Sequence, residues 1–433
     1  MERTLMQRLI VWKDSPHRKP LILSGARQVG KTWLLKEFGA AQFESVAYIS
    51  LDNDSPARSY FEPDFDIARI IASLSLQLDM DIKPDRTLII LDEIQTCPKA
   101  LTALKYFSEN APEYAVAAAG SLLGLLAHEG TGFPVGKVTT LELYPLSFRE
   151  FLGATGNQRY SELVHSGDAA LLNPFGGRLA ELLKRYYVVG GMPAAVADYA
   201  ERQDFGAVRE LQDQILADYS RDFAKHMPAR LLPRTLLVWE SIPKHLSREN
   251  KKLVFGQVRE GARASDFEES LEWLERAGLI HKVKRVTKPA VPLSAYFDGK
   301  SFKVFLVDVG LLGAMCGLDP QTILRGSAVF TEFKGALTEQ YVCQELVAEC
   351  GLEPFYWSAE NSRGEIDFLV QDRGNVYPIE VKAEENLRSK SLSAFSERYE
   401  GMRPRRFSLS GYREESWMRN VPLWAISNER LWR

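Results

Sequence analysis

The chain has 433 residues, of which 45% are hydrophobic and 26% are charged, and its formal net charge is -3. This length exceeds one ordinary hydrophobic core and indicates about two to four domains. The balanced charge excludes a uniformly basic nucleic-acid binder, so any such binding requires a local basic patch.

The cysteines and the hydropathy pattern indicate where in the cell the protein is expected. The four cysteines form no CxxC pair and stand apart from the six histidines, which argues against a zinc site and favours a reducing, cytoplasmic location. The N-terminal segment becomes charged within a few residues, unlike a signal peptide. Apolar runs fall short of the roughly 18 residues of a membrane helix, so we expect no membrane partner.

A phosphate-binding loop follows the first apolar run. The stretch "PLILSGARQVGKTWLLKEF" (20–38) has the pattern of a strand, a glycine-bounded loop and a helix, and its centre matches GxxxxGK[ST] in full. Glycines let backbone N–H groups surround a phosphate chain at a helix N-terminus. Lys31 is expected to reach the β- and γ-phosphates and Thr32 to bind Mg²⁺. The expected nucleotide-binding residues are Gly25, Ala26, Arg27, Gln28, Val29, Gly30, Lys31 and Thr32.

An acidic motif and a serine complete the predicted catalytic set. In "RTLIILDEIQ" (86–95) a strand that is apolar on both faces ends in two carboxylates, which suits a central parallel strand. Asp92 is expected to hold Mg²⁺ through water, and Glu93 to polarise the attacking water. Ser121 ends the next apolar strand, where it either senses the γ-phosphate or caps the following helix. Lys31, Glu93 and Ser121 are therefore the predicted catalytic residues of this domain.

Two further strands, at 45–53 and 137–143, alternate with helical patterns. This order predicts an α/β fold for residues 1–150, a doubly wound parallel sheet of the P-loop type. ATP is the expected nucleotide by class. Arg149, in "YPLSFREF" (144–151), is either a cation that stabilises transition-state charge or a surface residue.

The middle of the chain is predicted to hold a helical connector or lid over 151–230 and a winged helix-turn-helix over 231–315. The helix in "ASDFEESLEWLERAGLIHKVKRV" (264–286) begins at Ser265 or Asp266 and leads into a basic strand. Lys and Arg outnumber Asp and Glu by 13 to 8 between residues 244 and 303, which suits phosphate contacts. The expected recognition helix is acidic, however, so DNA binding and protein packing both stay open.

Residues 316–433 are predicted to form a nuclease-like domain. A helix places Glu339 on its apolar face, and two strands joined by a turn at 372–375 carry Asp367, Glu380 and Lys382. This arrangement resembles the restriction-endonuclease-like PD-(D/E)xK family, except that Ile366 occupies the position of the proline in the family motif. The resemblance implies a divalent metal held by Glu339, Asp367 and Glu380, with Lys382 as a catalytic residue. The alternative is a structural scaffold in which Lys382 forms a salt bridge with Glu380 or Glu339.

The order of these motifs along nearly the whole chain resembles prokaryotic AAA-like ATPases that carry a C-terminal domain of unknown function. The resemblance implies ATP binding and Mg²⁺-dependent hydrolysis. The first functional hypothesis couples hydrolysis to the handling of DNA or RNA, with or without cleavage. The alternative is an ATP-gated regulatory switch whose later domains bind a protein partner. The sequence leaves the oligomeric state open.

Overall fold

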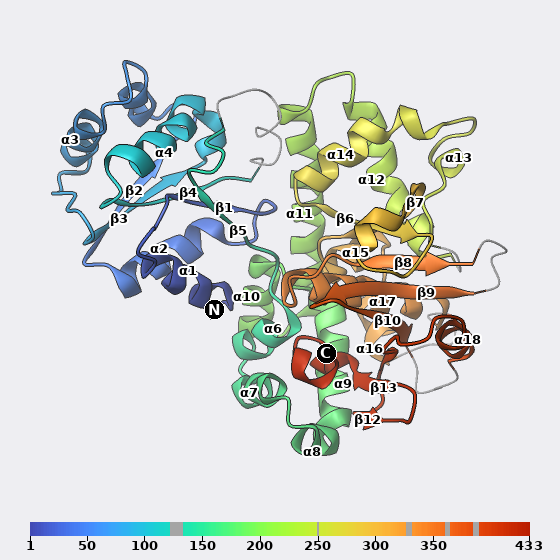
Figure 1. The fold of residues 1–433 in the computed structure, drawn as a ribbon. Helices are drawn as coiled ribbons and strands as arrows, with labels where there is room; N and C mark the ends of the chain where they lie inside the picture. Colours follow the sequence, from blue (N-terminus) through green and yellow to red (C-terminus); the bar gives the residue numbers. More distant parts are fainter. Residues whose placement is uncertain (122–132, 249–250, 326–330, 360–363, 384–388) are drawn as a thin grey trace. The chain divides into compact units, whose positions relative to one another are not determined.

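The computed structural model describes residues 1–433 except 122–132, 249–250, 326–330, 360–363 and 384–388. The described chain packs as two compact units (Figure 1). The P-loop unit consists of residues 2–144 and 276–278, and the C-terminal unit of Met1, residues 145–275 and residues 279–433. No helix within these described ranges is both long enough and apolar enough to cross a membrane.

The P-loop unit contains a five-stranded parallel sheet in the order β2-β3-β4-β1-β5. The order places β1 and β3 on either side of β4, so the ends of all three strands meet at one edge of the sheet. The predicted P-loop fold class is confirmed for this part of the chain. The strands are β1 (Leu21–Ser24), β2 (Ser45–Ser50), β3 (Thr87–Asp92), β4 (Ala115–Ala119) and β5 (Thr139–Glu142).

Helices cover both faces of this sheet (Figure 1). Every residue of β3 is buried, as its apolar sequence predicts for a strand covered on two sides. Ile89 and Leu91 belong to a core cluster shared with α3 and α4, whereas Leu88 lies beside Gly39 of α2. The helices are α1 (Leu5–Lys13), α2 (Lys31–Gln42), α3 (Ile67–Leu78) and α4 (Pro98–Asn110).

The C-terminal unit begins with a helical region, in agreement with the helix-rich pattern of the sequence. The pair Gly190–Gly191 separates α9 from α10, and a Cβ atom on Gly191 would lie only 2.0 Å from the backbone oxygen of Leu146. The helices are α6 (Phe148–Ala154), α7 (Gln158–Ser166), α8 (Ala169–Leu172), α9 (Gly176–Val189), α10 (Pro193–Arg202), α11 (Phe205–His226) and α12 (Leu232–Leu246).

Two strands, β6 (Ile280–Val286) and β7 (Phe297–Leu306), pair in antiparallel fashion and form a hairpin. However, β6 also pairs in parallel with β8 (Phe355–Ser358), so the hairpin is continuous with the C-terminal sheet. The helices before the hairpin are α13 (Phe255–Val258) and α14 (Glu268–Arg276), and those after it are α15 (Val309–Met315) and α16 (Pro320–Arg325).

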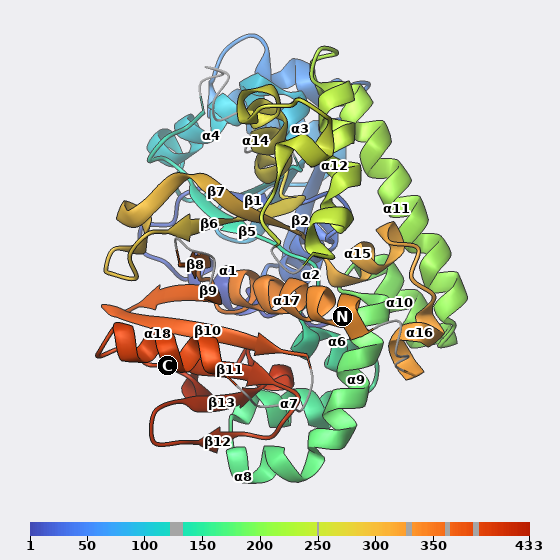
Figure 2. The same cartoon turned by 90° about the vertical axis from the view of Figure 1, so that its right-hand side faces the viewer.

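The C-terminal sheet is mixed and has eight strands in the order β12-β13-β11-β10-β9-β8-β6-β7 (Figure 2). The predicted hairpin is confirmed: Asp372 pairs with Asn375 across a two-residue turn in which Arg373 and Gly374 have φ of 46° and 78°, as a type I′ turn requires. The remaining elements are α17 (Thr331–Ala348), β9 (Glu365–Asp372), β10 (Asn375–Lys382), α18 (Lys390–Arg398), β11 (Arg405–Ser408), β12 (Arg413–Glu414) and β13 (Arg419–Pro422).

Candidate nucleotide site and C-terminal acidic centre

The predicted phosphate loop connects β1 to the N-terminus of α2. Gly25 has a φ of 138°, and a Cβ atom there would lie 2.1 Å from the backbone oxygen of Leu143, so only glycine fits. Lys31 is the first residue of α2, and its ammonium group donates to the carbonyl oxygens of Gly25 at 2.9 Å and Ala26 at 2.7 Å. Burial lowers the pKa of Lys31 to about 8, although Glu93 and Asp92 oppose this shift.

An arginine that the sequence motifs did not single out supports this loop. The guanidinium group of Arg3 donates to the backbone oxygen of Val29 at 3.1 Å and to that of Tyr144 at 2.6 Å. It thereby ties the phosphate loop to the segment that follows β5. Arg27 lies within the loop, and its positive charge contributes to the lowered pKa of Lys31.

The two predicted Mg²⁺ ligands lie side by side. The hydroxyl of Thr32 donates to Oδ2 of Asp92 at 2.7 Å, and the hydroxyl of Tyr48 donates to the same oxygen at 3.0 Å. The backbone N–H of Glu93 donates to Oδ1 of Asp92 at 3.0 Å. Because Mg²⁺ prefers a few carboxylate and hydroxyl oxygens together with phosphate oxygens, the residues present fit this ion.

The sequence motifs did not identify Tyr48, although its position on the strand beside β3 could have pointed to it. Its strand β2 pairs with β3 so that Ser50 lies opposite Asp92, and Tyr48 shares a face of the strand with Ser50. Burial and the neighbouring Asp92 carboxylate raise the pKa of Tyr48 to about 12. The tyrosine therefore stays a hydrogen-bond donor to Asp92 at neutral pH.

Glu93 and Ser121 lie at the ends of neighbouring strands. Glu93 has a φ of 53° and follows β3 directly, and its side chain accepts a hydrogen bond from the amide of Gln95. Ser121 follows β4 and is buried, and its hydroxyl has no hydrogen-bond partner among the described residues. The helix that Ser121 was expected to cap falls at 122–132, outside the described residues.

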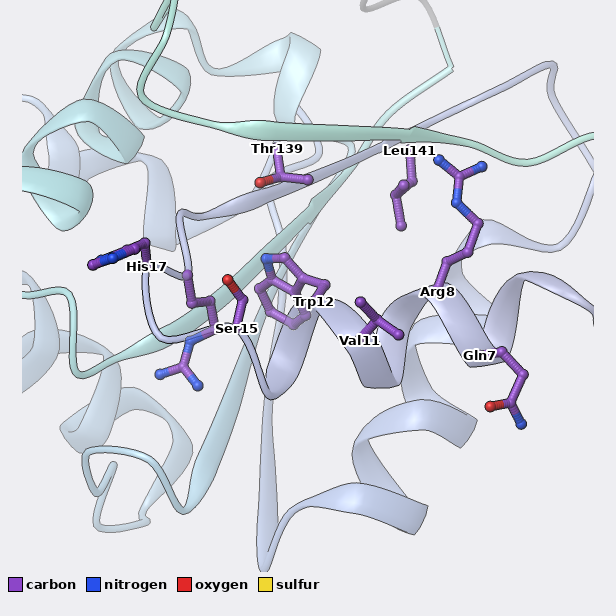
Figure 3. Close-up of a pocket in the computed structure, with 9 residues that line it drawn as sticks. Gln7, Arg8, Val11, Trp12, Ser15, His17, Thr139 and Leu141 are labelled. Atoms are coloured by element: carbon purple, nitrogen blue, oxygen red, sulfur yellow. The ribbon is translucent and has the colours of Figure 1, made fainter. Parts of the chain in front are cut away.

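A separate cavity of about 390 Å³ lies between α1 and the edge strand β5 (Figure 3). Trp12, Val11 and Leu141 supply its apolar walls. None of its lining residues belongs to the phosphate loop. This cavity is therefore distinct from the place where the loop would hold phosphates.

The residues predicted for the C-terminal acidic centre lie on three elements: Glu339 on α17, Asp367 on β9, and Glu380 and Lys382 on β10. Oε1 of Glu339 lies 2.7 Å from the ammonium group of Lys251. The ammonium group of the fully buried Lys303 lies 3.7 Å from Oε2 of Glu339 and 2.5 Å from Glu365. Two lysines that the sequence motifs did not include thus supply positive charge beside Glu339.

The other members of the centre are also held by protein groups. Oδ2 of Asp367 accepts a hydrogen bond from the backbone of Val381 at 2.8 Å, and burial and the charge of Glu339 raise the pKa of Asp367 to about 7. Lys382 lies 2.9 Å from Oε1 of Glu380, which is the ion pair expected for a structural scaffold.

Two carboxylate oxygens of this centre bear on the predicted metal site. Oε2 of Glu339 and Oε2 of Glu380 are buried and make no hydrogen bond with described residues. A metal ion would give such oxygens a partner. Across the described ranges, however, no group of three or more His, Cys, Asp and Glu side chains is arranged to hold a metal ion. The metal site at Glu339, Asp367 and Glu380 therefore stays a prediction.

The segment around Arg149 forms an unexpected acidic cluster in the C-terminal unit. Arg149 lies 3.7 Å from Glu349, which directly follows α17, and Glu345 of α17 accepts a hydrogen bond from the backbone of Phe148 at 2.8 Å. Glu150 completes a capping box with Ser147 at the start of α6. Burial and the nearby Glu349 raise the pKa of Glu345 to about 8. Arg149 is thus anchored by a carboxylate of its own unit.

Three protein-family models match separate parts of the chain. Residues 17–152 match the family model described as AAA domain. Residues 180–322 and 334–424 match two models described as domains of unknown function, DUF8612 and DUF4143. No curated protein matches the chain.

Solved structures show weaker likenesses. The Walker-type ATPase PABY2304 of Pyrococcus abyssi is 15% identical over 73% of this chain and 95% of its own, with a TM-score of 0.44. The Aeropyrum pernix Orc1 protein in complex with DNA (15% identity, 72% and 90% coverage, TM-score 0.27) and Cdc6p from Pyrobaculum aerophilum (13%, 74% and 93%, 0.26) also match. At these scores the likenesses do not assign a function. Residues 17–152 are thus similar to an AAA domain, and two models of domains of unknown function match later parts of the chain.

Proposed function

We propose that this protein is a Mg²⁺-dependent ATPase. The observation that carries the proposal is the 2.7 Å contact between Thr32 and Asp92, because it brings the two expected Mg²⁺ ligands together beside the N-terminus of α2. A helix N-terminus with a glycine loop favours a phosphate chain, and the AAA domain match over residues 17–152 supports ATP as the nucleotide.

The roles follow from where each group lies. The ammonium group of Lys31 exchanges its hydrogen bonds to the carbonyl oxygens of Gly25 and Ala26 for bonds to phosphate oxygens. A buried cation is costly without an oppositely charged partner, and the phosphates supply one. Mg²⁺ held near Thr32 and Asp92 neutralises charge on the phosphates when it is bound. Glu93 orients the attacking water, and the buried hydroxyl of Ser121 gains a partner at the γ-phosphate.

Two substitutions test these roles separately. Lys31→Ala is expected to abolish nucleotide binding, measured by calorimetry with ATP and Mg²⁺. Glu93→Gln is expected to keep binding and to reduce turnover by about a hundredfold or more, because only the group that activates water changes. Turnover by Glu93→Gln at the wild-type rate would show that another residue activates the water.

For the C-terminal unit, we propose a role in nucleic-acid handling that is driven by ATP hydrolysis. The winged helix-turn-helix interpretation of residues 231–315 and the nuclease-like interpretation of residues 316–433 belong to this proposal. The ion pairs of Lys251 with Glu339 and of Lys382 with Glu380 favour a second candidate, a regulatory switch that cuts nothing and binds a protein partner.

A cleavage assay separates the two candidates. Wild type and Asp367→Ala are incubated with DNA or RNA in Mg²⁺ or Mn²⁺, and ATP turnover is followed in parallel. Cleavage that disappears in Asp367→Ala supports the nuclease-like centre. Absence of both cleavage and nucleic-acid-stimulated ATP turnover in the wild type leaves the regulatory switch.

A further inference from the structure

A second cavity, of about 350 Å³, lies in the helical region of the C-terminal unit. This is within the range of small-molecule sites. It lies among α6, α9 and α10, and none of its lining residues belongs to the phosphate loop or to the acidic centre. Its lining residues are Phe151, Thr155, Asn157, Arg178, Leu182, Arg185, Tyr199, Ala200 and Gln203.

Two arginines from one helix line this cavity. Arg178 and Arg185 are seven residues apart on α9, so they share one face and are about 10 Å apart along the helix axis. The exposed Arg178 lies 3.6 Å from Glu181, which is also exposed. The guanidinium group of Arg185 donates to the hydroxyl of Tyr199 at 3.2 Å, and in the part of the chain that the structure describes it has no ion pair with Asp or Glu.

The rest of the lining suits an anion. It contains two hydroxyl and two amide side chains but no aspartate or glutamate. Tyr199 is buried, and its ring is stacked between Phe151 and Phe205, so the hydroxyl that meets Arg185 is held in place. Phe151 and Leu182 supply an apolar wall.

Charge balance indicates what would occupy the cavity. The half-buried guanidinium group of Arg185 loses hydration without gaining an ion pair with Asp or Glu among the described residues. The exposed Arg178 adds a second positive charge at the mouth of the cavity. An anion in the cavity would supply the partner that Arg185 lacks. Phosphate matches the planar donors of arginine better than a spherical anion does, because it accepts two parallel hydrogen bonds.

We infer that this cavity binds the phosphate group of a small organic phosphate ester through Arg178 and Arg185, with Thr155, Asn157 and Gln203 facing the polar remainder. The site is independent of the nucleotide site and of the proposed ATPase activity. A purely structural role for the arginines is the alternative, because α6 and α10 both end near the cavity and cations stabilise helix C-termini.

The test must exclude phosphate binding at the phosphate loop. The full chain carrying Lys31→Ala is therefore titrated with inorganic phosphate and with ribose 5-phosphate at constant ionic strength, by calorimetry and by thermal unfolding. The same measurements are made after adding Arg185→Gln or Arg178→Gln. Arg202→Gln is the matched control, because Arg202 lies on α10 and pairs with Asp198 at 3.3 Å.

Phosphate is expected to bind the Lys31→Ala protein and to raise its unfolding temperature. Arg185→Gln should weaken binding by about ten- to a hundredfold, as the loss of a charge-assisted hydrogen bond predicts, and Arg202→Gln should not. Tighter binding of ribose 5-phosphate than of phosphate would support the organic ester.

Three results would overturn the inference. One is no binding of either compound to the Lys31→Ala protein. Another is binding that survives both Arg185→Gln and Arg178→Gln. The third is a fall in unfolding temperature in these variants with unchanged phosphate affinity, which is what a helix-end role predicts. Because Arg178 is exposed, its variant keeps the test valid even where Arg185→Gln lowers stability.

Discussion

At the scale of single residues, Asp92 is held by three donors that come from different parts of the chain. Thr32 and the backbone of Glu93 belong to the two recognised motifs, but Tyr48 comes from β2. Partners that orient a metal ligand affect metal affinity almost as strongly as the ligands themselves. Tyr48 is therefore a positioning residue for the proposed Mg²⁺ site.

Tyr48→Phe is expected to raise the Mg²⁺ concentration for half-maximal ATP turnover by about tenfold. The substitution removes the hydrogen bond to Asp92 and leaves the ring in place. Affinity for ATP measured without Mg²⁺ should not change. Tyr106→Phe, whose ring stacks on Phe65 in the same unit, is the control. An unchanged Mg²⁺ dependence in Tyr48→Phe would show that the tyrosine does not position Asp92.

The buried carboxylate of Glu345 predicts a pH dependence of stability. Its pKa rises from 4.5 to about 8 because of burial and the nearby Glu349, so the native state keeps a proton that the unfolded state releases above pH 4.5. The free energy of unfolding is then expected to fall as the pH rises from about 4.5 to about 8.

Glu345→Gln should remove much of this slope and stabilise the protein at pH 9 by roughly 1 to 3 kcal/mol. Glutamine keeps an oxygen for the backbone N–H of Phe148 but carries no charge. Denaturant unfolding between pH 5 and pH 9 measures the effect. Glu353→Gln, an exposed carboxylate that pairs with Lys284, should leave the slope unchanged, and equal slopes in all three proteins would contradict the assignment.

Residues within continuous motifs were predictable from the sequence because their spacing reports their chemistry. Gly25 to Thr32 lie together on one loop, and Asp92 and Glu93 end one strand. Lys251 and Lys303 were not predictable, because they reach Glu339 from positions 88 and 36 residues before it in the chain. Only the tertiary fold brings these charges together.

At the scale of elements, the apolar runs predicted the strands of the P-loop unit near their observed bounds. The hairpin of β9 and β10 was predictable because Gly374 supplies a positive φ in its turn. The partner of β6 was not, because the parallel pairing with β8 joins residues about 70 positions apart. The sequence pattern of the β6–β7 hairpin is the same whether it is a free wing or part of a larger sheet.

The glycine pair after α9 is an element boundary whose role comes from close packing. Gly191→Ala is expected to destabilise the protein by roughly 2 to 4 kcal/mol, because the new Cβ atom would lie 2.0 Å from the backbone oxygen of Leu146, which cannot move aside as a flexible side chain does. Gly177→Ala, in the first turn of α9 with no atom within 4 Å of its Cβ position, should be neutral or stabilising by up to about 1 kcal/mol. Thermal unfolding of both variants measures the contrast, and equal effects would contradict the packing explanation.

At the scale of the whole molecule, the excess positive charge between residues 244 and 303 is smaller than the count of Lys, Arg, Asp and Glu in that window suggests. Lys251 and Lys303 pair with Glu339, and Lys303 also pairs with Glu365. Lys284 pairs with Glu353. These carboxylates lie outside the counted window, so a count over a window of sequence overstates the charge that remains for a partner. Lys282 and Lys288 lie over the rings of Phe302 and Tyr296.

The proposed nucleic-acid role predicts that Lys282 and Lys288 contact phosphates. Each phosphate contact releases counterions and steepens the fall of affinity with salt. The double variant Lys282→Gln/Lys288→Gln should therefore bind DNA more weakly and reduce the slope of log affinity against log salt by about 2. Fluorescence anisotropy of a labelled duplex at several salt concentrations measures both quantities. The control is Lys99→Gln/Lys137→Gln, because these exposed lysines pair with Glu62 and Glu109 in the P-loop unit. A wild-type slope in the first variant would place any DNA contact elsewhere, and a wild type that binds no DNA would favour the regulatory switch.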